Sequence, residues 1–169
     1  YKAQLYRPNL YDYYPSCEQN NYIFFAGSLW KKEVKTNSYR ANFIKACLNK
    51  NVKFEGGFSP RSKNDIYGFE NLTMKYREKM TSYICKMKMS TIAFNTPVVL
   101  DCHGWKLSEF LCFGKAIIST QLSRKLPSNL IDERHLLITD GTQNDIEKKI
   151  EVLMTNKELQ ISLKENSRK

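Results

Sequence analysis

Residues 101–119 read DCHGWKLSEFLCFGKAIIS, and this stretch decides the fold class of the 169-residue chain. Apolar side chains recur at helical spacing between Trp105 and Phe113, which predicts an amphipathic helix. Gly114 follows at the position where a left-handed residue commonly ends a helix. The apolar run 116–119 then predicts a strand that is buried on both faces. A helix that leads directly into a buried strand is the repeating unit of α/β domains with a parallel sheet.

The same alternation extends outward from this stretch in both directions. We therefore expect a Rossmann-like, doubly wound parallel sheet flanked by helices over residues 21–169, preceded by a linker or inter-domain segment at residues 1–20. The strands are predicted at 22–26, 52–57, 90–95, 116–119 and 135–139, and the helices at 37–49 (capped by Asn37 or Ser38), 74–86, 105–113, from 143 onward, and around Leu159 and Leu163.

Composition limits the kind of protein and the kind of partner. The chain has 41% hydrophobic and 26% charged residues, as soluble globular domains do, and no apolar run approaches the roughly 20 residues of a membrane-spanning helix. Five cysteines without a C-x-x-C pair suit a reducing, cytoplasmic setting. The net charge of +10 favours anionic partners, including nucleotides and, as a peripheral contact, the inner face of a membrane. Because Lys and Arg are spread along the chain, nucleic acid is not an expected partner.

Common cofactor motifs are missing from the sequence. It contains neither a dinucleotide fingerprint nor a P-loop. Cys102, His103 and Cys112 lack a fourth ligand at suitable spacing, and there is no D-x-D triplet, so no metal ion or other cofactor is expected. The charge of a bound phosphate would then have to be neutralised by protein groups.

The loop and helix of residues 101–113 offer such groups. Gly104 lets a ligand approach the backbone, and the following helix begins with N–H groups that have no partner within the helix. These N–H groups, the positive end of the helix dipole and Lys106 together favour a diphosphate. Glu109 lies off the apolar stripe, one turn into the helix, where its carboxylate can accept hydrogen bonds from the two vicinal hydroxyls of a ribose.

An acid-x7-acid pair followed by a short helix, a glycine and an apolar strand resembles the C-terminal, donor-binding domain of GT-B glycosyltransferases. Here the pair is Asp101 and Glu109, and Gly114 and residues 116–119 complete the pattern. The resemblance implies that Glu109 holds the nucleotide ribose and that Asp101 contacts the donor sugar. It implies metal-independent transfer from a nucleotide diphosphate sugar to a saccharide or lipid-linked acceptor, with Lys106 stabilising the leaving diphosphate. Because the family usually has Glu where this chain has Asp101, retention or inversion at the sugar is left open.

The resemblance extends to residues 26–28 and to Lys31 or Lys32 after the first strand, where the family places a glycine turn and basic diphosphate contacts. Residues 56–58, after the second strand, resemble the family's turn beneath the nucleotide base. The acceptor site of the family lies in an N-terminal domain that these residues do not contain, so we expect this fragment to bind donor but to transfer little by itself. A non-catalytic Rossmann-like module that binds a nucleotide or a protein is the alternative. The catalytic candidates are Asp101 and Lys106, and the ligand-binding candidates are Gly27, Ser28, Lys32, Gly57, His103, Gly104, Trp105, Leu107 and Glu109.

Some of these candidates have a second interpretation. Trp105 is better explained as an anchor for its helix than as a stacking platform. His103 either donates to a phosphate or sugar oxygen or is an exposed loop residue. Phosphate binding and a solvated surface are equally compatible with the basic residues after the first strand, which are Lys31, Lys32, Lys35 and Arg40.

Overall fold

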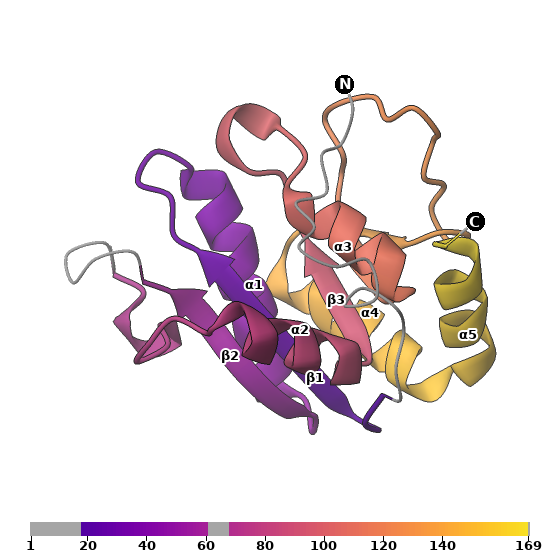
Figure 1. The fold of residues 1–169 in the computed structure, drawn as a ribbon, viewed down its shortest axis with the longest axis horizontal. Coiled ribbons are helices and arrows are strands. Elements are labelled where there is room, and N and C mark those ends of the chain that lie inside the picture. Colours follow the sequence, from indigo (N-terminus) through magenta and orange to yellow (C-terminus); the bar gives the residue numbers. More distant parts are fainter. Residues whose placement is uncertain (1–17, 61–67, 169) are drawn as a thin grey trace.

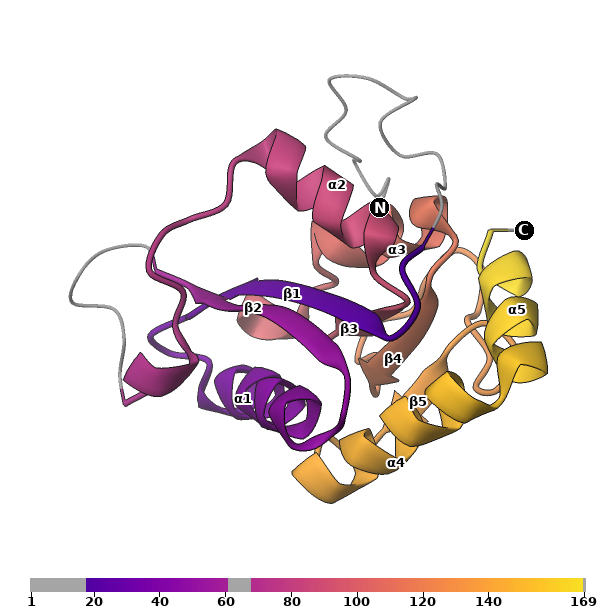
Figure 2. The same ribbon diagram turned by 90° about the horizontal axis from the view of Figure 1, so that it is seen from below.

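The computed structural model describes residues 18–60 and 68–168, and in these residues a layer of parallel strands lies between two layers of helices (Figures 1 and 2). The predicted α/β fold class is confirmed. The strands are β1 (Tyr22–Ser28), β2 (Lys53–Ser59), β3 (Ile92–Asn95), β4 (Ala116–Thr120) and β5 (Leu137–Thr139). The helices are α1 (Val34–Asn49), α2 (Met80–Met89), α3 (Trp105–Phe113), α4 (Gln143–Thr155) and α5 (Lys157–Asn166), with short 3₁₀ helices η2 (Glu70–Leu72) and η3 (Val99–Asp101).

The strands lie in the spatial order β2-β1-β3-β4-β5, and every ladder is parallel. β1 and β3 lie side by side without a continuous ladder. Near their amino ends Thr91 N–H donates to Tyr22 O at 2.8 Å, and Phe24 N–H donates to Ser90 Oγ at 2.9 Å. The winding reverses between β1 and β3, and open α/β sheets bind ligands outside the carboxyl ends of the strands at such a point. The register pairs include Tyr22 with Lys53, Ile92 with Ala116, and Ile118 with Leu137.

Side chains from β1 alternate between two cores. Ile23 and Phe25 enter the core on the face covered by α1 and α4, where Phe43 and Phe94 stack with ring centroids 4.3 Å apart. Phe24 enters the core on the opposite face, which α2 and α3 cover (Figure 2). Because both faces are covered, the strand needs no polar alternation, and its sequence is an unbroken apolar run.

The bounds of α3 agree with the prediction, whereas the start of α1 does not. α3 spans Trp105–Phe113, and Gly114 ends it in the left-handed conformation with φ 62°. α1 begins at Val34 because Asn37 does not cap it. The Asn37 side chain accepts from Trp30 N–H at 3.2 Å and donates to Trp30 O at 2.8 Å, which closes the loop before the helix.

α2 begins at Met80, six residues later than predicted. The preceding segment continues along the end of β2, since Met74 N–H donates to Phe58 O at 2.8 Å and Thr73 forms a bridge with Phe58. Of the predicted linker at 1–20, all but the last three residues lie outside the described part of the chain. In residues 18–60 and 68–168, no helix has the length and apolar character needed to cross a membrane.

Candidate functional site

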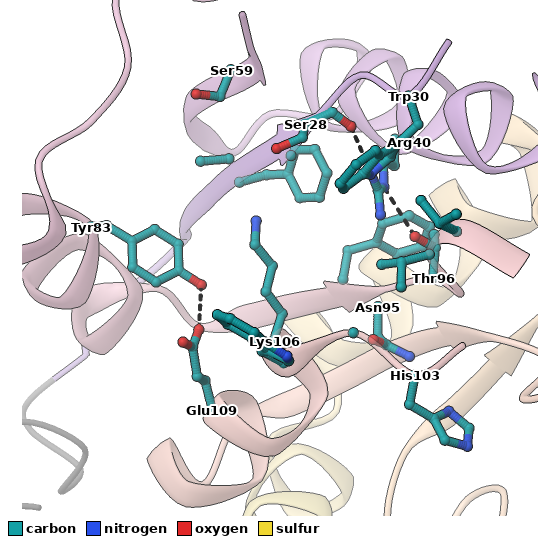
Figure 3. A pocket seen from close by; sticks show the side chains of 18 of the residues that line it. Ser28, Trp30, Arg40, Ser59, Tyr83, Asn95, Thr96, His103, Lys106 and Glu109 are labelled. Carbon is teal, nitrogen blue, oxygen red and sulfur yellow. Dashed lines mark hydrogen bonds between the residues drawn. The ribbon is translucent and has the colours of Figure 1, made fainter. Parts of the chain in front are cut away.

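A cavity of about 660 Å³ opens at the carboxyl ends of β1 and β3, where the winding of the sheet reverses (Figure 3). Its floor includes Gly27 and Ser28 at the end of β1 and Asn95 and Thr96 at the end of β3. The first turn of α3 forms one wall, and residues from α2 and the segment before it form another. The cavity therefore lies where the topology of an open α/β sheet favours ligand binding.

α3 begins at the cavity, and its N-cap residue provides no side-chain cap. Gly104, the N-cap residue, has an extended conformation with ψ 154°, and no side chain of the described residues caps the helix. Leu107 N–H donates to Gly104 O at 3.2 Å, so this amide is used within the first turn. The amides before it and the helix dipole give this wall of the cavity a positive potential.

Lys106 extends from α3 into the cavity (Figure 3). Its ammonium lies 5.7 Å from the ring centroid of Phe25 and 5.4 Å from that of Tyr83. Among residues 18–60 and 68–168, no carboxylate forms an ion pair with it. Burial, with the positive charge of Arg40 nearby, lowers the pKa of Lys106 to about 7.

Arg40 brings a second positive charge to the floor of the cavity. It extends from α1 and is buried, with 6% of its surface exposed. Its Nε donates to Thr96 Oγ1 at 3.0 Å and its Nη1 donates to Ser28 O at 2.6 Å, so the guanidinium joins the carboxyl ends of β1 and β3. Burial lowers the pKa of Arg40 to about 10, which leaves the group charged at neutral pH.

Glu109 lies one turn further along α3 than Lys106 and also lines the cavity. Its Oε2 accepts a hydrogen bond from the hydroxyl of Tyr83, on α2, at 2.9 Å. Burial raises the pKa of Glu109, and the hydrogen bond from Tyr83 and the charge of Lys106 counteract part of that rise. Arg77 and Glu78 also line the cavity, and Glu78 is paired with Lys86. One cavity thus brings Lys106, Arg40 and Glu109 together with the amino end of a helix.

The structure brings most of the predicted site residues together. Seven of them line the cavity, namely Gly27, Ser28, His103, Gly104, Trp105, Lys106 and Glu109. Trp105 corrects our expectation of a helix anchor, because 69% of its surface is exposed and it forms part of the cavity wall. His103 also lines the cavity, but its imidazole is turned away from Lys106 and Glu109 (Figure 3), with Nε2 2.9 Å from the carbonyl oxygen of Arg124.

Four predicted residues do not line the cavity, and the structure places each of them elsewhere. Leu107 is buried on the apolar side of α3, with 2% of its surface exposed. A Cβ at Gly57 would lie 2.5 Å from Leu72 O, so this glycine is required by backbone packing. Asp101 is exposed in a left-handed turn (φ 56°) and accepts a hydrogen bond from Ser123 through its carbonyl. Lys32 is exposed in the loop before α1.

Sequence reasoning left Arg40 open between phosphate binding and a solvated surface, and it missed Tyr83; the structure rules out the solvated surface, because Arg40 is buried. A signal for Arg40 was present, because it is spaced three and seven residues before Phe43 and Cys47, on the buried stripe of α1. A charged residue on such a stripe is rarely buried without a partner or a function. Tyr83 carried no comparable signal, since its contact with Glu109 depends on how α2 packs beside α3. In the described part of the chain, no group of three His, Cys, Asp or Glu residues is placed to hold a metal ion.

We compared the sequence and the fold of this chain with those of known proteins. No family model and no curated protein matches the sequence. The C-terminal domain of the glycosyl transferase group 1 family protein LpcC from Francisella tularensis is 12% identical and superposes with a TM-score of 0.64 over 96% of this chain and 95% of that chain. A point mutant of S. aureus TarM in complex with fondaparinux, α-GlcNAc-glycerol and UDP is 12% identical, with a TM-score of 0.62 over 98% of this chain. A proposed UDP-N-acetylglucosamine 2-epimerase from Listeria monocytogenes is 12% identical, with a TM-score of 0.59 over 96% of this chain.

These similarities establish the fold of the chain. It is the fold of the C-terminal domain of GT-B glycosyltransferases, as the acid-x7-acid pattern and the apolar strands predicted. The chain spans 34% of the TarM chain and 43% of the epimerase chain. The epimerase has the same fold, so the fold by itself does not specify sugar transfer.

Proposed function

We propose that this chain is the donor-binding domain of a glycosyltransferase and that it binds a nucleotide diphosphate sugar in the cavity between β1 and β3. One observation carries the proposal: two buried or half-buried cations, Lys106 and Arg40, face one cavity without an ion pair to any carboxylate of the described residues. An unbalanced charge in a low-dielectric site is costly, and an anionic ligand removes that cost.

The arrangement of α3 suits the two halves of a nucleotide diphosphate. Lys106 and Glu109 are three residues apart on one helix, which places their side chains about one turn from each other. The diphosphate would lie against Lys106 and the amino end of α3, above Arg40. The ribose would then reach Glu109, whose carboxylate accepts hydrogen bonds from its hydroxyls. UDP is the first nucleotide to test, because it is bound in the TarM structure.

Stabilisation of the leaving group would be the catalytic contribution of this domain. When the bond between the anomeric carbon and the diphosphate oxygen breaks, the electron pair stays on that oxygen and negative charge grows there. Lys106 and the first amides of α3 would stabilise this charge without a metal ion. The acceptor would be a saccharide or a lipid-linked sugar. The site that binds it, and the group that takes its proton, would lie in a second domain, so this domain alone would bind donor and transfer little. The enzyme would be cytoplasmic, and with a lipid-linked acceptor it would also contact the inner face of the membrane.

A thermal-unfolding screen of the chain with nucleotides and nucleotide sugars tests the proposal. A ligand at 100 times its dissociation constant should stabilise the protein by about 2.7 kcal/mol. Glu109→Gln should remove most of this shift, because a neutral amide accepts hydrogen bonds from the ribose less strongly. Glu158→Gln, at an exposed position in the first turn of α5, is the matched control and should keep the full shift. If no nucleotide diphosphate stabilises the protein, the proposal is wrong.

A non-catalytic binding module is the second candidate, and the position of Asp101 favours it. The resemblance assigns the contact with the donor sugar to Asp101, yet this residue does not line the cavity. A module would bind nucleoside diphosphates with or without the sugar equally well. A donor domain should bind one nucleotide sugar more tightly than it binds the nucleoside diphosphate alone or the same nucleotide carrying a different sugar.

A further inference from the structure

Tyr83 contacts both charged side chains that α3 places in the cavity. It extends from α2, and its hydroxyl donates to Glu109 Oε2 at 2.9 Å (Figure 3). The centroid of its ring lies 5.4 Å from Lys106 Nζ. The ring also packs edge-on against Phe24, with centroids 6.0 Å apart, so its position is fixed from the sheet side.

Lys106 and Glu109 would be expected to pair with each other. They are three residues apart on one helix, which is a spacing at which Lys and Glu side chains form ion pairs. No such pair forms in this structure. Instead the phenol of Tyr83 binds the carboxylate of Glu109, and the ring of Tyr83 lies beside the ammonium of Lys106. Tyr83 thus keeps the two charges apart, and each stays available to a ligand.

We propose that Tyr83 is a positioning residue that orients Glu109 and so makes the cavity selective for ribonucleotides over 2′-deoxyribonucleotides. The inference rests on the proposed function. With Oε2 held by Tyr83, the other oxygen, Oε1, accepts no hydrogen bond from the described residues and belongs to a side chain that lines the cavity. A carboxylate fixed in this way binds two vicinal hydroxyls in one geometry, whereas a mobile carboxylate also pairs with Lys106 and discriminates less.

The test compares the dissociation constants of UDP and 2′-deoxy-UDP, measured by calorimetry for the wild type and for Tyr83→Phe. The wild type should prefer UDP by about tenfold, which corresponds to one hydrogen bond to a charged group. Tyr83→Phe keeps the ring beside Lys106 and Phe24 but removes the donor. This variant should lose most of the preference, chiefly through weaker binding of UDP. Tyr76→Phe, at an exposed position outside the cavity lining, is the matched control and should keep the preference.

A Glu109→Gln background separates positioning from a general structural effect. If Tyr83 acts through Glu109, Tyr83→Phe should leave the ratio of the two dissociation constants unchanged in Glu109→Gln protein. A purely structural role of Tyr83 would weaken both nucleotides equally in both backgrounds.

The possible failures are distinguishable. Absence of UDP binding by the wild type would overturn the proposed function. A wild type that prefers UDP while Tyr83→Phe keeps the same ratio would overturn the role of Tyr83 alone. Equal binding of the two nucleotides by the wild type would overturn the ribose contact of Glu109 together with its positioning by Tyr83, but not diphosphate binding at Lys106.

Discussion

Two lysines of this domain are buried in different ways. Lys115, at the start of β4, has 1% of its surface exposed, and its Nζ donates to Glu18 Oε1 at 2.9 Å and to the carbonyl oxygens of Lys88 and Ser90 at 2.7 Å each. Lys106 has two aromatic rings beside its ammonium and no acceptor among the described residues. Burial lowers the pKa of both lysines.

The difference lies in what balances each charge. Three acceptors surround the ammonium of Lys115, so its charge is satisfied within the fold and it joins β4 to the end of α2 and to Glu18. The charge of Lys106 is left open toward a cavity. A cation that the fold has already satisfied is part of the structure, whereas one left open at the switch point of an α/β sheet is available to an anionic ligand.

The largest effect should follow from removing the satisfied cation. Lys115→Met leaves the carbonyl groups of Lys88 and Ser90 without this donor and leaves Glu18 with Lys164 as its remaining partner, which should lower the free energy of unfolding by about 3 kcal/mol. For a domain of this size the corresponding fall in Tm is roughly 6–12 °C. Urea denaturation measures the effect, and Lys148→Met, at an exposed position on α4, should stay within about 0.5 kcal/mol of the wild type. If Lys115→Met is as stable as the wild type, Lys115 is not a structural cation, and the contrast with Lys106 is wrong.

A smaller effect should appear in the pH dependence of ligand binding. In the free protein the pKa of Lys106 is lowered to about 7, so this side chain loses its charge as the pH rises above 7. A bound diphosphate favours the ammonium and raises that pKa. The affinity for a nucleotide sugar should therefore fall by up to about tenfold per pH unit between pH 7 and 9. Nucleotide sugars are the suitable ligands, because they lack the terminal phosphate that titrates near pH 6.

The binding profile of Lys106→Met provides the control for this dependence. Because methionine does not titrate, the affinity of Lys106→Met for a nucleotide sugar should not change between pH 7 and 9. A wild-type affinity that does not change between pH 7 and 9, or a variant with the same slope, would show that Lys106 does not hold the diphosphate.

The smallest effect is on the stability of the ligand-free protein. Lys106→Met removes a half-buried charge that has no acceptor within residues 18–60 and 68–168, so the free energy of unfolding should stay the same or rise by up to about 1 kcal/mol. The same urea titration that detects the loss in Lys115→Met measures it. A loss as large as that of Lys115→Met would mean that Lys106 is a structural cation after all.

The sequence predicted those parts of the fold that depend on local patterns. α3, the left-handed Gly114 and β4 follow from helical spacing, a glycine stop and an unbroken apolar run, and the structure has all three. The start of α1 was predicted too late because the side chain of Asn37 bonds to Trp30, a loop contact that no periodicity reports.

Only the part of the site that lies on a single helix could be predicted from the sequence. Lys106 and Glu109 could be found because they lie on one predicted helix, and their spacing places them on one face. Arg40 and Tyr83 come from other elements, and only packing brings α1 and α2 to the cavity. The sequence also could not distinguish Lys106, in the first turn of α3, from Lys115, just after that helix, because the acceptors of Lys115 come from residues 25 to 97 positions away.

The most direct test of the central claim is the dissociation constant of a UDP-sugar for Lys106→Met, measured by calorimetry at pH 7 beside the wild type and Lys148→Met. We expect at least about tenfold weaker binding by Lys106→Met, with Lys148→Met equal to the wild type, because one charged contact to the diphosphate is lost. Equal dissociation constants for all three proteins would contradict the claim that the open charge of Lys106 serves a bound diphosphate.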